Sequence, residues 1–126
     1  MIFEGEYDRI NISRCRDTLV RNARVRELRI REAAVKIEDS LIGGPDGQLY
    51  VDDARVTITS SRIEGKAAIT ALEAHLDIAG SLIIGTEAAL VAPLSSEVLF
   101  SLCRVQSPNF NGNLHGLRTV MPGHPL

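Results

Sequence analysis

The sequence is poor in several residue types that carry recognition chemistry. It contains no tryptophan, and phenylalanine and tyrosine make up only 4% of its 126 residues, so the stacking platforms of single-strand nucleic-acid binders are missing. Its longest apolar stretch, residues 88–94, is too short to cross a bilayer. The start lacks the basic and apolar regions of a secretion signal. We expect no membrane segment and no nucleic-acid partner, and a cytoplasmic location if the chain is complete.

Charge is nearly balanced along the whole chain but not locally. The formal net charge is −2, yet residues 1–36 hold nine of the 14 Lys and Arg against six acids. Arg14, Arg16, Arg24 and Arg26 are therefore a candidate anion-binding patch. A solvated basic face without a ligand explains the same residues.

An apolar pattern that returns at nearly equal intervals is the strongest feature present. Its clearest copies start at Val35, Val56, Leu76 and Val98, and we interpret Ile10 as the start of a first copy, which makes the first interval the longest. An apolar residue precedes each start by seven positions, and a small or short residue precedes it by two. The first set is Phe3, Leu28, Leu49, Ile69 and Val91, and the second is Asp8, Ala33, Ala54, Ala74 and Ser96.

Within each copy apolar and polar residues alternate with period 2, which predicts strands, and the constant spacing predicts that successive copies stack around one core. We therefore expect an all-β, right-handed, single-stranded parallel β-helix with about five coils of roughly 20–25 residues over residues 1–105. Ile37, Ile58, Ile78 and Phe100 should form one inward stack. The longest connection is expected between Cys15 and Leu28. Residues 106–126, rich in Gly, Pro and Asn, are expected to form an irregular capping tail of the same domain.

The repeated unit, Val/Leu-x-Ile/Phe-x-x-Ser/Cys-x-Ile/Val over residues 3–105, resembles the right-handed parallel β-helix superfamily, the pectate-lyase-like proteins. The resemblance implies architecture more than activity, because the same coil serves polysaccharide lyases and hydrolases, phage and adhesin shafts, and small self-associating scaffolds. No catalytic motif of these enzymes can be matched here. We assign no catalytic residue, cofactor or metal ligand.

The two cysteines are predicted to be free. We place Cys15 and Cys103 on one inward row with Ser40, Ser61 and Ser81, so they lie four coils apart, roughly 19 Å at the spacing of neighbouring strands. That is too far for a disulfide. Both are expected to be small buried thiols.

One outward row collects carboxylates, reading Tyr7, Glu32, Asp53, Glu73 and Ser95, with Asp52 beside it. On neighbouring rungs these groups would lie about 5 Å apart, close enough to recruit a cation or a glycan. The resemblance implies a nearby basic residue as proton acceptor, and Arg31 and Arg55 are near in register. A solvated face neutralised by these arginines remains the alternative.

Three further outward rows end in leucine, at Leu72, Leu94, Leu99 and Leu102. Exposed leucines on adjacent rows would form an apolar patch that monomers avoid, so we expect the tail or another subunit to cover them. The rows begin with Glu6, Asn11 and Arg14, and a fourth row reads Arg9, Ala34, Arg55, His75 and Glu97, which predicts that His75 pairs with Glu97.

These observations favour a non-catalytic structural or binding module: a rigid solenoid that forms a homo-oligomer or belongs to a larger assembly. The alternative is a carbohydrate-active protein that acts on a polysaccharide through Glu32, Asp53 and Glu73. The sequence does not identify the ligand, the partner or the number of subunits.

Overall fold

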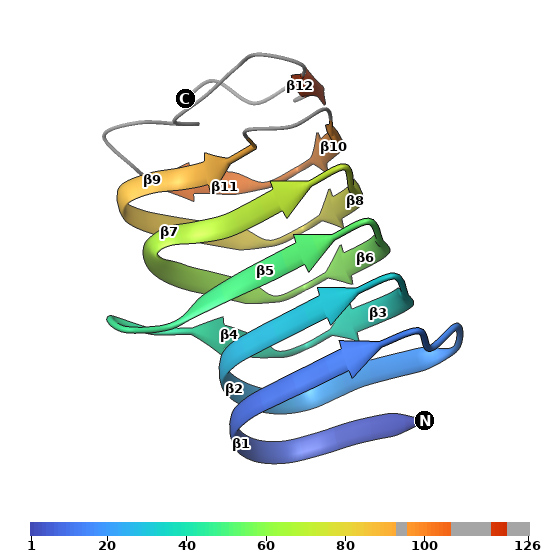
Figure 1. Cartoon of the computed structure of the whole chain (residues 1–126). Coiled ribbons are helices and arrows are strands. Elements are labelled where there is room, and N and C mark those ends of the chain that lie inside the picture. The colour runs from blue at the N-terminus through green and yellow to red at the C-terminus, as the bar shows by residue number, and fades with distance from the viewer. Residues whose placement is uncertain (93–95, 107–116, 121–126) are drawn as a thin grey trace.

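The structure, a computed structural model, describes residues 1–92, 96–106 and 117–120. All regular elements in these ranges are strands (Figure 1). They are β1 (Ile2–Ser13), β2 (Thr18–Arg31), β3 (Ala34–Glu38), β4 (Leu41–Gly43), β5 (Gln48–Asp52), β6 (Arg55–Thr59), β7 (Arg62–Leu72), β8 (His75–Ala79), β9 (Leu82–Val91), β10 (Ser96–Ser101), β11 (Arg104–Gln106) and β12 (Leu117–Val120). The described part contains no helix long and apolar enough to span a membrane.

The strands stack in three parallel columns that each turn of the chain visits in order. Column A holds the start of β2, then β3, β6, β8, β10 and β12. Column B holds the middle of β2, then β4, the first part of β7, the first part of β9, and β11. Column C joins the end of β2 to β5 and to the later parts of β7 and β9. The predicted fold is confirmed: the chain is a parallel β-solenoid of about five turns.

The core consists of ladders of inward side chains, in which residues in register on successive strands stack on one another. Ile37, Ile58, Ile78 and Phe100 are partners on successive strands of column A and are at most 2% exposed. Leu28, Leu49, Ile69 and Leu90 form the matching ladder of column C, each 0% exposed. The predicted inward stack is thus confirmed, and so is the spacing of the copies that start at Val35, Val56, Leu76 and Val98.

The register predicted for the first copy is wrong. Ile10 pairs with Leu28 in column C, and the partner of Val35 is Thr18. The first coils contain fewer residues than the later ones, and the difference lies at the corner from column B to column C. The inward residues on its two sides are three positions apart in β2, at Val25 and Leu28, and seven positions apart one turn later, at Ile42 and Leu49, where Gly44–Gly47 forms a loop. The segment between Cys15 and Leu28, predicted to be a long connection, lies mostly within β2.

This shift also corrects the first residue of each predicted row. Arg14, and not Tyr7, stands below Glu32, while Asn22 and not Arg14 stands below Asp39. Ser13 replaces Glu6 below Arg31, and Leu19 replaces Asn11 below Lys36. Likewise Arg9 pairs with Glu27 and does not belong below Ala34.

The inward row of serines begins at Ala23 and not at Cys15. Ser40 Oγ accepts a hydrogen bond from the backbone N–H of Ala23, Ser61 Oγ from that of Ser40, and Ser81 Oγ from that of Ser61, at 3.1–3.2 Å. Each hydroxyl donates to the carbonyl two residues before it. Cys103 follows in the row, whereas Cys15 lies in the other row of small residues, with Ala33 and Ala54. Both thiols are free, Cys103 buried and Cys15 half-buried.

Two corners of the coil are made by one residue in the left-handed backbone conformation. At the corner from column A to column B, φ lies between 47° and 57° at Asn22, Asp39, Ser60, Gly80 and Leu102. At the corner from column C to column A, it lies between 48° and 56° at Arg14, Glu32, Asp53 and Glu73. Asn, Asp and Gly tolerate this conformation best. Each corner is therefore made by a single exposed residue per rung, which carries a side chain at every position named except Gly80.

The segment expected to be an irregular tail contributes a further strand. β12 pairs in parallel with β10, Ser96 facing Leu117 and Leu99 facing Val120, so column A continues beyond residue 106. The other residues of the expected tail, 107–116 and 121–126, lie outside the described residues.

Candidate functional site

The structure keeps the predicted carboxylate row together. Glu32, Asp53 and Glu73 occupy one corner on successive rungs, all exposed, and the N–H groups of Glu32 and Asp53 donate to the coil above at 3.0 and 2.9 Å. A groove of about 410 Å³ follows this corner, lined also by Arg16, Arg55 and His75. Glu32, Asp53 and Glu73 are also the residues that form the corner, and each adopts the left-handed backbone conformation there. This backbone role accounts for part of the row without any function of the carboxylates.

The surroundings of these carboxylates are basic. Arg14 Nε lies 3.1 Å from Glu32 Oε2, and Arg31 Nε lies 3.9 Å from Asp52 Oδ2. Asp52 projects from the end of β5, next to the corner. Within the described residues, no group of three or more His, Cys, Asp or Glu side chains has the arrangement needed to hold a metal ion.

The four arginines of the predicted anion patch do not form one surface. Arg14 and Arg16 belong to the carboxylate corner. Arg26 is bound on two nitrogens by Asp8, at 2.7 and 3.3 Å, and its third nitrogen donates to the backbone carbonyl of Asp46 at 3.1 Å. The hydrogen bond and charge of Arg26 hold the pKa of Asp8 below its ordinary value. Arg24 stands apart on the outer face of column B.

The predicted leucine face is spread over different parts of the coil. Leu72 ends β7 in column C and Leu99 lies in β10 of column A, and both are half-buried. Leu102 sits at the corner that follows β10 and is 83% exposed. Leu94 lies outside the described residues. His75 and Glu97 are register partners on β8 and β10, which confirms their row, but no ion pair between their side chains is present among the described residues.

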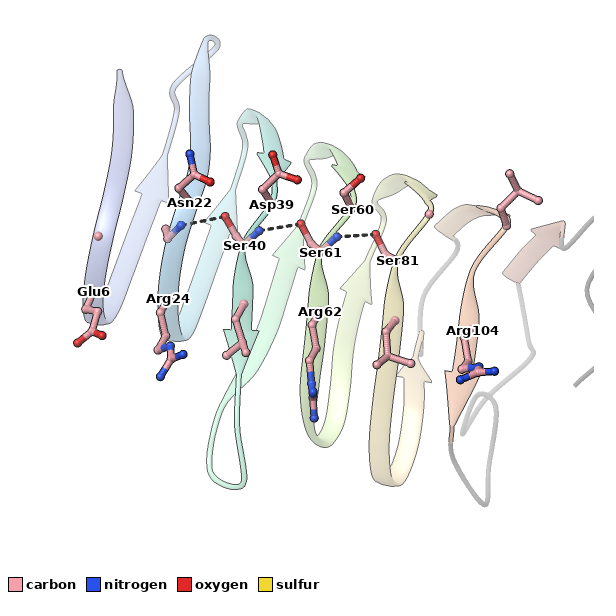
Figure 2. Close-up of a pocket in the computed structure, with 16 residues that line it drawn as sticks. Glu6, Asn22, Arg24, Asp39, Ser40, Ser60, Ser61, Arg62, Ser81 and Arg104 are labelled. Carbon is pink, nitrogen blue, oxygen red and sulfur yellow. Dashed lines mark hydrogen bonds between the residues drawn. The ribbon is translucent and has the colours of Figure 1, made fainter.

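An open groove of about 1030 Å³ follows the corner from column A to column B. Figure 2 shows the buried serines along its floor, with Asn22, Asp39 and Ser60 on one side. The other side is the first outward row of column B, which reads Glu6, Arg24, Leu41, Arg62, Leu82 and Arg104. We call this surface the corner groove and its three arginines the arginine row.

Sequence reasoning missed the arginine row, although a local signal exists. Each of its members directly follows a residue of the small inward row: Ala23-Arg24, Ser61-Arg62 and Cys103-Arg104. Reading the residue after each member of that row, and not only after the serines, would have shown the alternation of arginine and leucine. The mistaken register of the first copy would have assigned the wrong first member, Arg16, because it placed Cys15 where Ala23 belongs.

The first coil differs from the others in what its inward residues contact. Phe3 and Tyr7 are the register partners of Val20 and Val25, which are both 0% exposed, yet Tyr7 is 37% exposed and Phe3 is half-buried. Their rings contact each other edge to face, with centroids 5.9 Å apart. Met1 and Ile2 beside them are 72% and 54% exposed. Apolar surface therefore gathers at the edge of β1.

Comparisons with known proteins add no family to this description. No protein-family model, no curated protein and no solved structure matches the chain. The chain is therefore identified by its fold alone, as a parallel β-solenoid of about five turns.

Proposed function

We propose that the protein is a non-catalytic structural module, a rigid solenoid that associates with a second copy of itself through the edge of β1. The observation that carries this proposal is the exposure of Tyr7, which is 37% exposed in the first coil although its partner in the next coil, Val25, is 0% exposed, with the exposed Ile2 on the same strand. In the described part of the chain, β1 pairs with β2 along one side only. A 12-residue edge strand with apolar neighbours is a template for pairing with another chain.

Two properties of the coil support a structural role. Its corners are short and regular, and its core ladders continue from β1 to β10 without interruption, which favours a stiff rod. A self-complementary patch of this kind most commonly closes as a twofold dimer. Pairing of two β1 edges would bury Tyr7 and Ile2 and would satisfy the free backbone groups of both strands.

Molar mass in solution, measured by light scattering over a range of protein concentrations, tests the proposal. We expect a dimer for the wild type and a monomer for the double variant Ile2→Lys, Tyr7→Lys, because lysine on an edge strand opposes pairing. The matched control is Leu99→Lys, Leu102→Lys, which adds the same charge on column A and its corner and should keep the wild-type mass.

Two results would contradict the β1 interface. A wild type that stays monomeric at high concentration would remove self-association altogether. A leucine double variant that becomes monomeric, with the β1 variant still dimeric, would move the interface to the leucines at the far end of the coil.

A carbohydrate-active, pectate-lyase-like protein is the second candidate. It is favoured by one observation, the three carboxylates Glu32, Asp53 and Glu73 on successive rungs beside Arg55 and His75. Cleavage of a polysaccharide that is lost in the triple variant Glu32→Gln, Asp53→Asn, Glu73→Gln would favour this function over the structural one.

A further inference from the structure

The arginine row has a fixed charge interval. Arg24, Arg62 and Arg104 occupy alternate rungs of column B, with Leu41 and Leu82 on the rungs between them. Neighbouring parallel strands lie about 4.8 Å apart, so successive arginines are about 10 Å apart along the rod. Stacked strands hold this interval, whereas charges on flexible loops would not keep it.

All three guanidinium groups are accessible. Arg24 and Arg104 are exposed and form no ion pair with any residue in the described ranges. Arg62 lies 3.3 Å from Glu64, and its side chain is 47% exposed. An exposed pair of this kind is weak, so Arg62 can exchange Glu64 for another carboxylate. Guanidinium groups bind carboxylates through two parallel hydrogen bonds.

The remaining walls restrict the kind of anion. On the opposite side Asn22, Asp39 and Ser60 offer one polar side chain on each of the first three rungs, and Gly80 and Leu102 follow on the next two. Asp39 and Glu6 are themselves negative (Figure 2). A densely charged polymer such as a nucleic acid would meet these carboxylates. None of the residues that line the groove is aromatic, so bases would find no stacking partner. The groove suits a ligand with widely spaced charges and many hydrogen-bonding groups.

A polyproline II helix has the required period. It has three residues per turn and a rise of about 3.1 Å per residue, so every third side chain lies on one face at intervals of about 9 Å. A β-strand repeats on one face at about 6.7 Å, which matches neither one rung nor two. The polyproline II backbone has no internal hydrogen bonds, so its N–H and C=O groups are free to bond to the polar wall.

We propose that the corner groove binds an extended acidic peptide in the polyproline II conformation, with an acidic residue at every third position paired to Arg24, Arg62 and Arg104. The two leucines of the row would contact the residues between the charges. Seven peptide residues span about 19 Å, the distance covered by the four rungs from Arg24 to Arg104. This inference does not depend on self-association through β1.

Fluorescence anisotropy with two labelled peptides of equal composition tests the proposal on the full chain. The first peptide is Glu-Pro-Pro-Glu-Pro-Pro-Glu, and the second carries its three glutamates together, as Glu-Glu-Glu-Pro-Pro-Pro-Pro. We expect the spaced peptide to bind at least about tenfold more tightly, because only its carboxylates reach three guanidinium groups at once. This comparison uses the wild type, so it does not rely on any variant being folded.

Variants then locate the site. Arg62→Gln should weaken binding of the spaced peptide about fivefold, as expected for one solvent-exposed charge pair. The triple variant Arg24→Gln, Arg62→Gln, Arg104→Gln should lose detectable binding. The matched control is Arg16→Gln, Lys36→Gln, Arg55→Gln, which removes the same charge from exposed positions outside the groove and should bind like the wild type.

Three results would overturn the inference. Equal affinity for the two peptides, or an equal loss in the control triple variant, would show attraction to net charge without a built site. Binding of an acidic polysaccharide such as hyaluronan, with no binding of the spaced peptide, would assign the groove to a different class of polymer.

Discussion

At the scale of single residues, one polar side chain stands on an inward row that is apolar in the later coils. Thr18 occupies the place held by Val35, Val56, Leu76 and Val98 in later coils. It is 3% exposed, and its Oγ1 atom has no hydrogen-bond partner among the described residues. A buried hydroxyl without a partner costs free energy that an apolar group of the same shape does not.

Thr18→Val should therefore stabilise the protein. We expect the free energy of unfolding to rise by about 1 kcal/mol, measured by urea denaturation with an unchanged m-value. Thr57→Val, an outward change in the same column, serves as the control and should have little effect. A destabilised Thr18→Val variant would mean that the hydroxyl is bonded in solution.

At the scale of elements, the serine ladder joins successive coils. The Ser61 hydroxyl accepts from the N–H of Ser40, in the preceding coil, and donates to the carbonyl of Thr59 at 2.8 Å. Strand pairing connects the strands of two coils, whereas this ladder satisfies backbone groups at the turn between strands. Removing one hydroxyl leaves a buried donor of the neighbouring coil without an acceptor.

We expect Ser61→Ala to lower the free energy of unfolding by about 1–3 kcal/mol, the cost of an unsatisfied buried backbone group. Chemical denaturation measures the change. Ser60→Ala is the matched neighbour, since Ser60 is exposed and lies outside the ladder, and it should cost much less. Equal effects of the two substitutions would show that the hydroxyl ladder contributes little.

At the scale of the whole molecule, the arginines of the first coils are balanced by acids on adjacent rungs. Arg9 and Arg29 both bind the buried Glu27, at 2.6 and 3.3 Å, and Arg21 binds Glu4 at 3.3 Å. Burial by itself would raise the pKa of Glu27, but the hydrogen bonds and charges of Arg29 and Arg9 outweigh it and hold that pKa below its ordinary value. The positive charge of this part of the chain is thus largely structural.

A carboxylate whose pKa is depressed in the folded state stabilises the fold above its unfolded pKa, and that contribution is lost as the pH falls through the folded value. We expect the Glu27→Gln variant to be less stable than wild type above pH about 5, and the difference to shrink toward pH 3. Thermal denaturation of both proteins across this pH range measures it. A difference that is constant with pH would contradict the assigned role of Glu27.

The sequence by itself determined the coil. Each strand must bury one face, so every second residue of the strand is apolar, and this alternation marks the inward positions. Copies that start at Val35, Val56, Leu76 and Val98 are almost evenly spaced, and their alignment was predicted correctly. The carboxylate row at Glu32, Asp53 and Glu73 followed from the same spacing.

Only the tertiary structure decided how the first coils align with the later ones and which charged side chains form ion pairs. Their shorter step depends on how many residues the chain uses at the corner before column C, and Thr18 weakens the apolar signal that would have marked the true alignment. The partners of Arg9 and Arg26 likewise depend on that register. Apolar periodicity fixes which side of a strand is buried, whereas the stagger between coils is set by corner conformation and by hydrogen bonds between residues one coil apart.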